Sequence, residues 1–174
     1  LNSDIFVVLD DVQFEKNGLQ NRNKIRTDKG STWLTVPIRN APLTTLLSDI
    51  RISDVNWSTR HINLINENYR FAKHFSVFTD FFDIYEKNFS LLIDLNMSLI
   101  NYILKKLEIN TKIIYSSSLN VDLKGSERIL EICCKLNADF YVSGAGGKNY
   151  LKLGDFQKND IVVEFQNFLH PKYT

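Results

Sequence analysis

The chain contains two kinds of hydrophobic pattern, and each kind predicts a different secondary structure. A continuous apolar run of strand composition lies at residues 4–9, and such a run is typical of a strand covered on both faces. Residues 111–116, 139–142 and 161–165 are also predicted to be strands. Residues 31–38 and 46–52 are two further predicted strands with a connection between them. Apolar residues at helical spacing predict helices at residues 57–71, 90–107 and 123–136.

The order of these elements predicts the fold class. Strand, helix and strand follow one another between residues 111 and 142, which is the order of a right-handed parallel crossover. We therefore expect an α/β fold with a mostly parallel, twisted sheet of about six strands, flanked by helices and carrying a helical insertion in the middle. Five aromatic residues fall within residues 75–85 of this insertion, and we interpret them as core packing.

Polar side chains follow the first predicted strand. Asp10 and Asp11 come directly after the run of residues 4–9, and Gln13 lies two positions further on. Ligands of open α/β sheets bind beyond the carboxyl ends of the strands, so these three are candidate catalytic residues. The two acids could hold a hard cation such as Mg²⁺ beside a phosphate substrate. A pair of acids that only terminates a strand is the alternative interpretation.

Residues 14–29 are too polar for a core element and are predicted to form a loop. Asn21, Arg22 and Asn23 place a planar guanidinium between two amides, a grouping suited to phosphate or carboxylate recognition. A solvated loop without a ligand is the alternative.

A glycine-rich loop follows the strand at residues 139–142. Glycine-rich turns and helix amino termini present free backbone amides to anions, and a nearby cation adds charge. The segment does not have the spacing of a phosphate-binding P-loop or of a dinucleotide fingerprint, so a simple tight turn is the alternative. The candidate ligand-binding residues here are Lys124, Ser126, Ser143, Gly144, Gly146, Gly147 and Lys148.

Composition excludes several classes of function. The 174 residues, 44% of them hydrophobic, fit one domain with a core, and a net charge of +1 without a long basic run argues against nucleic acid as a partner. Cys133 and Cys134 are adjacent on a predicted helix, which indicates buried thiols of a reducing compartment without a disulfide, and no histidine and cysteine spacing suits a metal. No apolar run predicts a membrane span or a secretion signal, so we expect a cytoplasmic protein.

Several motifs together resemble one known family. The stretches LDDVQF at residues 9–14, NRNKI at 21–25, KGSERI at 124–129, SGAGGKNYL at 143–151 and FLHPKY at 168–173 resemble the WbqC-like family of bacterial proteins, over nearly the whole chain. The resemblance implies a role in the synthesis of O-antigen, capsule or another surface glycan, with some members described as glycine or acyl transferases acting on amino sugars.

The resemblance also has consequences for the ends of the chain. Family members begin with a segment like QPxxxPxxGYF before the equivalent of Asp4, and they end with a PN-containing stretch. The chain begins at Leu1 and its single methionine is Met97. We therefore expect residues 1–174 to be a single WbqC-like domain that is truncated at both ends. The first segment resembles nucleotide-binding motifs of nucleotidyltransferase-like folds, so the fold is expected to be nucleotidyltransferase-like or Rossmann-like.

These observations lead to a functional hypothesis. We predict an enzyme that transfers an acyl or aminoacyl, glycyl-like group to the amine of a nucleotide-linked sugar, its small-molecule substrate. Asp10 or Asp11 would act as base or orienter, and Arg22 and residues 124–148 would bind anionic groups. Residues 123–150 and the end of the first strand would form two walls of one site.

The sequence is also compatible with other functions. One is a nucleotidyltransferase-like enzyme that uses Mg²⁺ or a nucleotide, and another is a non-catalytic ligand-binding or scaffold module of a glycan-synthesis complex. A homo-oligomer stays open as well.

Overall fold

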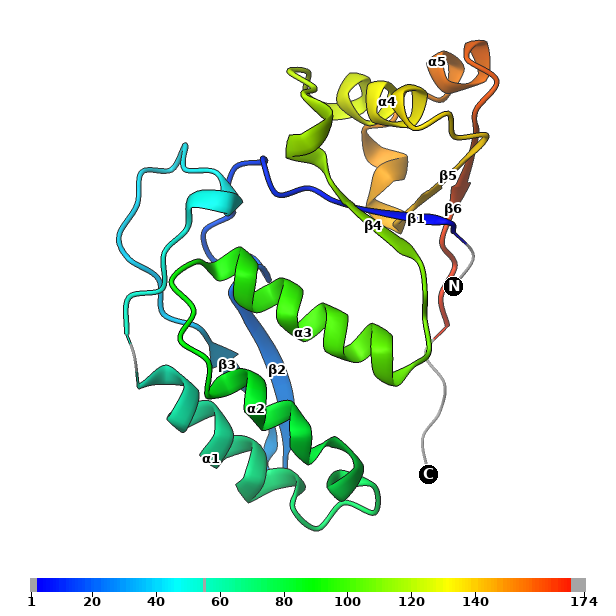
Figure 1. Ribbon diagram of the computed structural model, residues 1–174. Helices are drawn as coiled ribbons and strands as arrows, with labels where there is room; N and C mark the ends of the chain where they lie inside the picture. Colours follow the sequence, from blue (N-terminus) through cyan, green and yellow to red (C-terminus); the bar gives the residue numbers. More distant parts are fainter. Residues whose placement is uncertain (1–2, 55, 170–174) are drawn as a thin grey trace. The chain divides into compact units, whose positions relative to one another are not determined.

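Two groups of elements make up the computed structural model of the chain, which describes residues 3–54 and 56–169 (Figure 1). Unit 1 combines Leu1–Leu9 with Thr111–Thr174, and unit 2 consists of Asp10–Asn110. The first strand of unit 1 therefore precedes unit 2 in the sequence, and the rest of unit 1 follows it.

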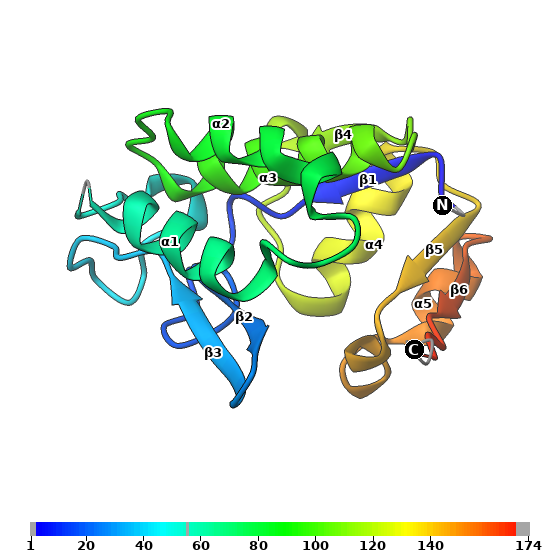
Figure 2. The same cartoon turned by 90° about the horizontal axis from the view of Figure 1, so that it is seen from below.

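The described residues of unit 1 form four short strands, two α-helices and two 3-10 helices. In chain order its elements are β1 (Ile5–Val8), β4 (Lys112–Tyr115), the 3-10 helix η3 (Ser116–Leu119), α4 (Gly125–Lys135), β5 (Phe140–Ser143), the 3-10 helix η4 (Ala145–Asn149), α5 (Leu153–Lys158) and β6 (Val162–Phe165). Strand β1 pairs with β4, and β5 pairs with β6, both in parallel. Figure 2 shows the two pairs as separate ribbons.

The core of unit 1 lies where α4 and α5 pack on the strands. Ile129 and Cys133 of α4 are buried beside Phe156 of α5 and Ile161, and Phe156 is 0% exposed. Partly buried apolar residues of the strands, among them Tyr141, pack against this cluster. Burial of these side chains is the main stabilising term for the unit.

The described residues of unit 2 form a hairpin, three α-helices and two 3-10 helices. In chain order its elements are β2 (Arg22–Thr27), β3 (Gly30–Thr35), the 3-10 helix η1 (Leu47–Asp49), α1 (Trp57–Tyr69), the 3-10 helix η2 (Phe75–Phe81), α2 (Phe82–Tyr85) and α3 (Leu92–Lys106). Strands β2 and β3 are antiparallel. The hairpin turn ends at Gly30, whose φ of +121° is a conformation that favours glycine.

The α/β class and the three predicted helices are confirmed, but the prediction of a single mostly parallel sheet is wrong. The six described strands form three two-stranded sheets, one of them antiparallel. Residues 22–27, predicted as loop, form β2, because a polar strand can pair with β3 without being buried on both faces.

The predicted strand at residues 46–52 is wrong for a different reason. Leu47 and Ile50 are both buried, and they lie three positions apart, which is the repeat of a 3-10 turn. The Ile50 backbone oxygen accepts a hydrogen bond from Leu92 N–H at 2.9 Å, so this turn packs on the start of α3. Isolated bridges, such as Ile38 with Ile52, are the only sheet-like pairs that flank it in the described part of the chain.

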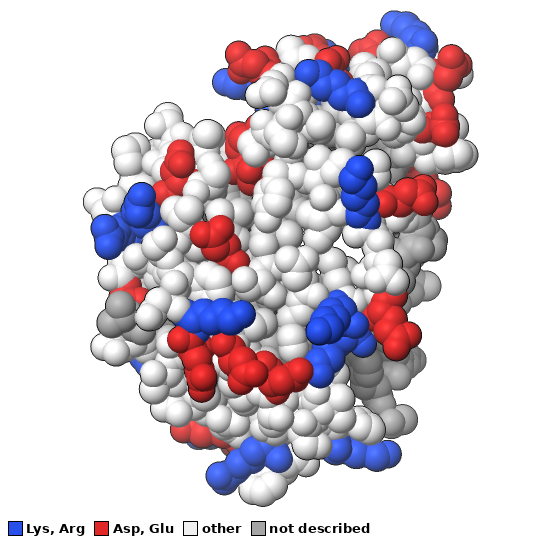
Figure 3. Space-filling view, viewed as in Figure 1, with Lys and Arg blue, Asp and Glu red and all other residues white. Residues whose placement is uncertain are grey.

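On the face that Figure 3 shows, acidic and basic residues are interspersed with uncharged ones. The helices of the described residues include none that is long and apolar enough to cross a membrane.

Candidate functional site

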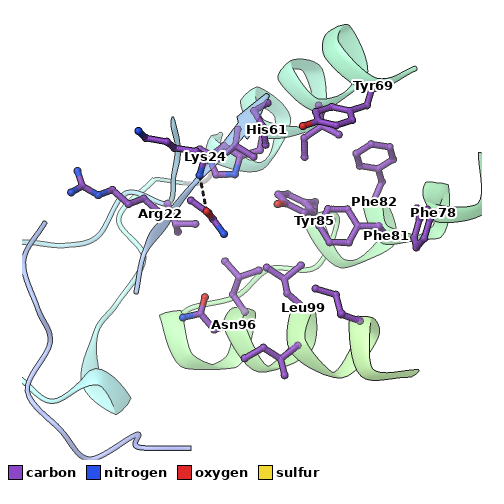
Figure 4. A pocket seen from close by; sticks show the side chains of 18 of the residues that line it. Arg22, Lys24, His61, Tyr69, Phe78, Phe81, Phe82, Tyr85, Asn96 and Leu99 are labelled. Atoms are coloured by element: carbon purple, nitrogen blue, oxygen red, sulfur yellow. Dashed lines mark hydrogen bonds between the residues drawn. The ribbon is translucent and has the colours of Figure 1, made fainter. Parts of the chain in front are cut away.

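A cavity of about 870 Å³ lies within unit 2, between the β2–β3 hairpin and helices α1, α2 and α3. In Figure 4 the rings of Phe81, Phe82 and Tyr85 face Leu99 and Asn96 of α3 across it. The lining is mostly aromatic and aliphatic, with a few amides and hydroxyls, two histidines and the cationic residues Arg22, Lys24 and Lys73. This composition, and a volume in the range of roughly 300–1,000 Å³, are typical of small-molecule sites.

The β2–β3 hairpin presents one of its faces to the cavity. Asn23 pairs with Leu34 across the hairpin, paired residues share a face, and both line the cavity. On the other face, the guanidinium carbon of Arg22 and the ammonium of Lys24 lie 4.5 Å and 4.9 Å from the ring centre of Trp33. Figure 4 shows the side chains of Arg22 and Lys24 extending away from the rings of η2 and α2 on the opposite wall. The hairpin thus lines the cavity with the amide of Asn23 and apolar side chains, and Arg22 and Lys24 border it with their charged groups over the ring of Trp33.

Aromatic side chains of η2 and α2 form another wall. The ring centres of Phe81 and Tyr85 are 5.1 Å apart, and those of Phe75 and Phe82 are 6.1 Å apart, with inclined planes. Core packing, which the sequence suggested for this segment, describes Tyr85, which is 7% exposed. Tyr85 and Phe78 both line the cavity, but Phe78 is 46% exposed and is therefore not part of the packed core. The segment thus has both a packing surface and a free aromatic surface.

His61 of α1 is buried in the cavity wall and has a defined tautomer. Its Nε2 lies 3.1 Å from the backbone oxygen of Thr35, and a carbonyl can only accept, so Nε2 carries the donated proton. The Trp57 ring is edge-on at 5.2 Å. Burial lowers the pKa of His61 from its ordinary value, the Thr35 bond opposes this shift, and the charge of Arg60 lowers the pKa further. The ring is therefore neutral near pH 7, which leaves Nδ1 as an acceptor.

The lowered pKa of His61 predicts a loss of stability in mild acid. The unfolded chain binds a proton near the ordinary pKa of 6.5, whereas the folded protein binds it only at lower pH. Between the two values the unfolded state holds more protons, so the free energy of unfolding should fall as the pH drops below 6.5. Denaturant titrations at several pH values measure this decrease.

Two variants test whether His61 causes this loss of stability in mild acid. His61→Gln keeps an N–H for Thr35 but cannot take up a proton, so its stability should depend less on pH than that of the wild type. His74→Gln, which changes an exposed histidine, is the control for replacing a histidine by glutamine elsewhere in the unit. Equal pH dependence in His61→Gln and the wild type would contradict the assignment.

Amide side chains at one end of the cavity are held by backbone groups. Asn96 Nδ2 donates to the backbone oxygen of Gln20 at 2.9 Å, and Asn21 Nδ2 donates to that of Val36 at 3.0 Å. Each amide keeps its own carbonyl oxygen as an acceptor. Burial raises the pKa of Tyr85 to about 12, so its hydroxyl stays protonated. The cavity can therefore bind a ligand with an apolar body and hydrogen-bonding groups at one end.

The predicted residues before and in β2 lie at this cavity. Asn21, Arg22 and Asn23 all line it. The guanidinium of Arg22 donates to the backbone oxygens of Gly18 and Asn17, and this holds the loop against the hairpin. The role of the three residues in binding an anion stays a prediction.

Asp10, Asp11 and Gln13 follow β1 and belong to unit 2. Asp10 is 6% exposed, and its backbone oxygen accepts from Ser48 N–H at 2.9 Å. Asp11 is half-buried, while Gln13 is exposed and forms an isolated bridge with Leu46. None of the three is among the described residues that line the cavity. Their catalytic role stays a prediction.

The other predicted residues lie in unit 1, around α4 and η4. Lys124 is the exposed residue that precedes α4. Ser126 is 7% exposed, and its Oγ accepts a hydrogen bond from Lys152 N–H at 2.9 Å, which ties α4 to the segment before α5. Lys148 is exposed, with its Nζ 5.4 Å from the ring centre of Phe165. A site that combines these residues with the end of β1 stays a prediction.

The glycine-rich segment forms η4, and its glycines differ in their surroundings. Gly147 N–H donates to the Gly144 backbone oxygen at 3.0 Å, and the buried Ser143 Oγ donates to the same oxygen at 3.1 Å. A Cβ atom on Gly147 would lie 2.1 Å from Ser143 Oγ, whereas one on Gly144 or Gly146 would meet nothing within 4 Å. Close packing explains the glycine at position 147, and anion binding by the segment stays a prediction.

The two cysteines of α4 have different environments. Both are free thiols and Cys133 is buried, as predicted, but the prediction that Cys134 is buried is wrong. Cys134 is exposed, because neighbouring residues of a helix point about 100° apart. Burial, together with the neighbouring Cys134, raises the pKa of Cys133 to about 11. Over residues 3–54 and 56–169 no three His, Cys, Asp or Glu side chains lie close enough to share a metal ion.

Comparison with known proteins identifies the family. The sequence model of the WbqC-like protein family matches residues 1–174. The chain belongs to this family. WbqC-like proteins are linked to polysaccharide biosynthesis in general, and the resemblance inferred from the motifs is confirmed.

One relative is similar over most of its length. The uncharacterized protein Rv1507c of Mycobacterium tuberculosis is 30% identical over 168 residues, which are 95% of this chain and 73% of the relative. No solved structure matches the chain significantly.

The cavity of unit 2 was not predicted from the sequence of this WbqC-like protein. The apolar face of α3 was predicted, but it has two environments: Leu92 is 0% exposed and is not among the residues that line the cavity, whereas Leu99, Ile100 and Ile103 line it. Ile103 is 50% exposed. A continuous apolar stripe looks the same in the sequence whether it is covered or open. The dense aromatic segment at residues 75–85 was the available signal.

Proposed function

We propose that this WbqC-like protein is an enzyme of bacterial surface-polysaccharide biosynthesis, of the O-antigen or capsule type. It transfers an acyl or aminoacyl group to the amine of a nucleotide-linked sugar. The donor is an activated acyl carrier such as a thioester. Membership of a family that is linked to polysaccharide biosynthesis supports the pathway, and the cavity of unit 2 supports a small-molecule substrate.

The observation that carries the proposal is the composition of this cavity. Aromatic and aliphatic side chains line its body, and amides from Asn21, Asn23 and Asn96 line one end. An acyl chain or a nucleobase fits an apolar, ring-lined space, because burial there removes apolar surface from water. Amides can hydrogen-bond to a carbonyl or to sugar hydroxyls without requiring a charge on the ligand.

The transfer step has simple chemical requirements. The lone pair of the sugar amine attacks the acyl carbonyl carbon and forms an N–C bond. The bond from this carbon to the leaving group then breaks, the leaving group takes the electron pair, and the amine loses a proton. In the proposal Asp10 or Asp11 accepts that proton or orients the amine. Arg22, Lys124 and Lys148 are the proposed partners of anionic groups such as the diphosphate of the nucleotide sugar.

Filling the cavity should weaken substrate binding. Leu99 lies in the cavity wall, so a Leu99→Trp substitution places a large ring in the space that the ligand needs. Calorimetric titration with a nucleotide-linked amino sugar and, separately, with an acyl thioester measures binding to each variant. We expect the Kd of the ligand that occupies the cavity to rise at least about tenfold.

The matched control is Leu107→Trp, because Leu107 follows the last turn of the same helix and is 61% exposed. This variant should bind like the wild type, and circular dichroism of both variants shows whether they fold. Unchanged Kd values in a folded Leu99→Trp variant would exclude the cavity as the binding site.

A non-catalytic binding module is the second candidate, and one observation favours it. The residues that line the cavity in the described part of the chain include no Asp or Glu. Mass spectrometry of a reaction that contains nucleotide sugar and thioester separates the two candidates, because only the enzyme produces the acylated sugar. A nucleotidyltransferase would instead consume a nucleoside triphosphate with Mg²⁺ and release pyrophosphate.

A further inference from the structure

A second cavity lies within unit 1, between the two strand pairs. Its volume is about 690 Å³. Residues of β1 line one side, residues of β5 line the other side, and the apolar face of α4 contributes Ile129, Ile132, Cys133 and Leu136. Strand β1 has β4 as its partner, β5 has β6, and the two pairs are separate sheets (Figure 2).

The hydrogen bonds of β1 show which backbone groups point toward this cavity. Lys112 N–H of β4 donates to the Asp4 oxygen, and in a parallel pair alternate residues bond to the same neighbour. The backbone groups of Phe6 therefore point to β4. Those of Ile5 and Val7 point to the opposite edge of β1, and both residues line the cavity.

Strand β5 shows the same arrangement from the other side. Val162 N–H of β6 donates to the Asp139 oxygen, so the backbone groups of Tyr141 point to β6. Those of Phe140 and Val142 point away from β6, and both residues line the cavity. Among the described residues neither free edge has a strand partner. Two rows of N–H and C=O groups without a strand partner thus border one gap. Leaving such groups without hydrogen bonds costs free energy where the backbone is partly buried.

We propose that this gap holds an additional β-strand from the same natural polypeptide, outside residues 1–174. Only an extended backbone offers donors and acceptors on both of its edges at the repeat that β1 and β5 require. Such a strand would join the two pairs into one sheet of five strands. This inference does not rest on the proposed function, because it uses only the strand pairing of unit 1 and the gap between its strand pairs.

The chemistry of the gap also limits the sequence of the strand. Leu9 and Tyr141 pack on the core that α4 forms, so alternate side chains of an inserted strand would face the same apolar surface. The strand should therefore have apolar residues at every second position at least. Both neighbouring strands have four residues, so a strand of similar length suffices.

A strand from the same polypeptide is favoured over one from a separate partner. The aligned residues are 73% of the relative from Mycobacterium tuberculosis, so 27% of that relative lies outside the match and is long enough to provide one strand. A covalently linked strand also has a high effective concentration, which a separate peptide lacks.

Hydrogen exchange of the natural full-length protein tests the proposal. The amides of Val7 and Val142 should exchange about as slowly as those of Phe6 and Tyr141, which bond to β4 and β6. The amide of Ile113 points away from β1 on the outer edge of β4, and it is the reference for an unpaired strand amide. We expect Val7 and Val142 to exchange roughly tenfold more slowly than Ile113, or slower still, in a monomer.

Three outcomes are distinguishable. Slow exchange at Val7 and Val142 in a monomer, defined by light scattering, supports the proposal. Exchange as fast as that of Ile113 overturns it. Slow exchange that disappears when a dimer is diluted to monomers overturns the assignment to the same polypeptide and indicates a strand from a second copy.

Discussion

Phe156→Ala is expected to lower the free energy of unfolding by about 3–5 kcal/mol. Phe156 is 0% exposed and packs with Ile129, Cys133 and Ile161 in the core of unit 1. Its ring is stacked on that of Tyr141, with the centres 6.0 Å apart. Removal of the ring loses its apolar burial and leaves a cavity among side chains held by separate elements. Because domains are stable by only about 5–15 kcal/mol, this is a large loss.

Urea unfolding followed by circular dichroism measures the effect. Leu153→Ala is the control in the same helix, since Leu153 is 49% exposed, and it should cost less than about 1 kcal/mol. Phe156→Leu retains part of the apolar volume, so its loss of free energy of unfolding should lie between those of the two alanine variants. It can be measured even if Phe156→Ala does not fold. A cost for Phe156→Ala no greater than that for Leu153→Ala would show that the core is not organised as described.

Gly147→Ala is expected to destabilise the protein by about 1–3 kcal/mol, because it overpacks the turn after β5. The added Cβ would lie 2.1 Å from Ser143 Oγ, 3.0 Å from Leu151 Cδ1 and 3.2 Å from Phe165 Cε1. Ser143 is 2% exposed, so its hydroxyl has little room to move away. The turn or the end of β5 must shift to accept the methyl group.

Gly146→Ala provides the control for this substitution. A Cβ on Gly146 would meet nothing within 4 Å, and its φ is not positive, so the change should stay within about 0.5 kcal/mol. Thermal or urea unfolding compares the two variants. Equal stability of both would contradict the packing role of Gly147. The structurally neutral Gly146→Ala variant is also suited to ligand titrations, since any loss of anion binding could not be attributed to misfolding.

The sequence motif and the structure give different reasons for the same glycines and lysine. As a motif, the three glycines and Lys148 predict an anion loop. In the structure, Gly147 is required by contact with Ser143, and Lys148 lies over the ring of Phe165. Neither contact excludes a ligand, but each gives the residue a structural reason to be present.

The local elements of this protein follow from its sequence. The helices α1, α3 and α4 were predicted close to their observed bounds, as were strands β1, β4, β5 and β6, because helical and strand periodicity depends on neighbouring residues alone. Family membership was also readable from the motifs, since their order along the chain is independent of the fold.

The pairing of strands and the cavities were decided only by tertiary structure. Strand β2 is polar, and only its pairing with β3 makes residues 22–27 a strand. Leu92 and Leu99 belong to one apolar stripe, yet Leu99 lines a cavity, whereas Leu92 is buried completely and is not among the residues that line it. Which edge of β1 is paired and which borders a gap depends in the same way on segments more than 100 residues away. Local periodicity states which face of an element is apolar, while contacts between distant segments determine what covers that face.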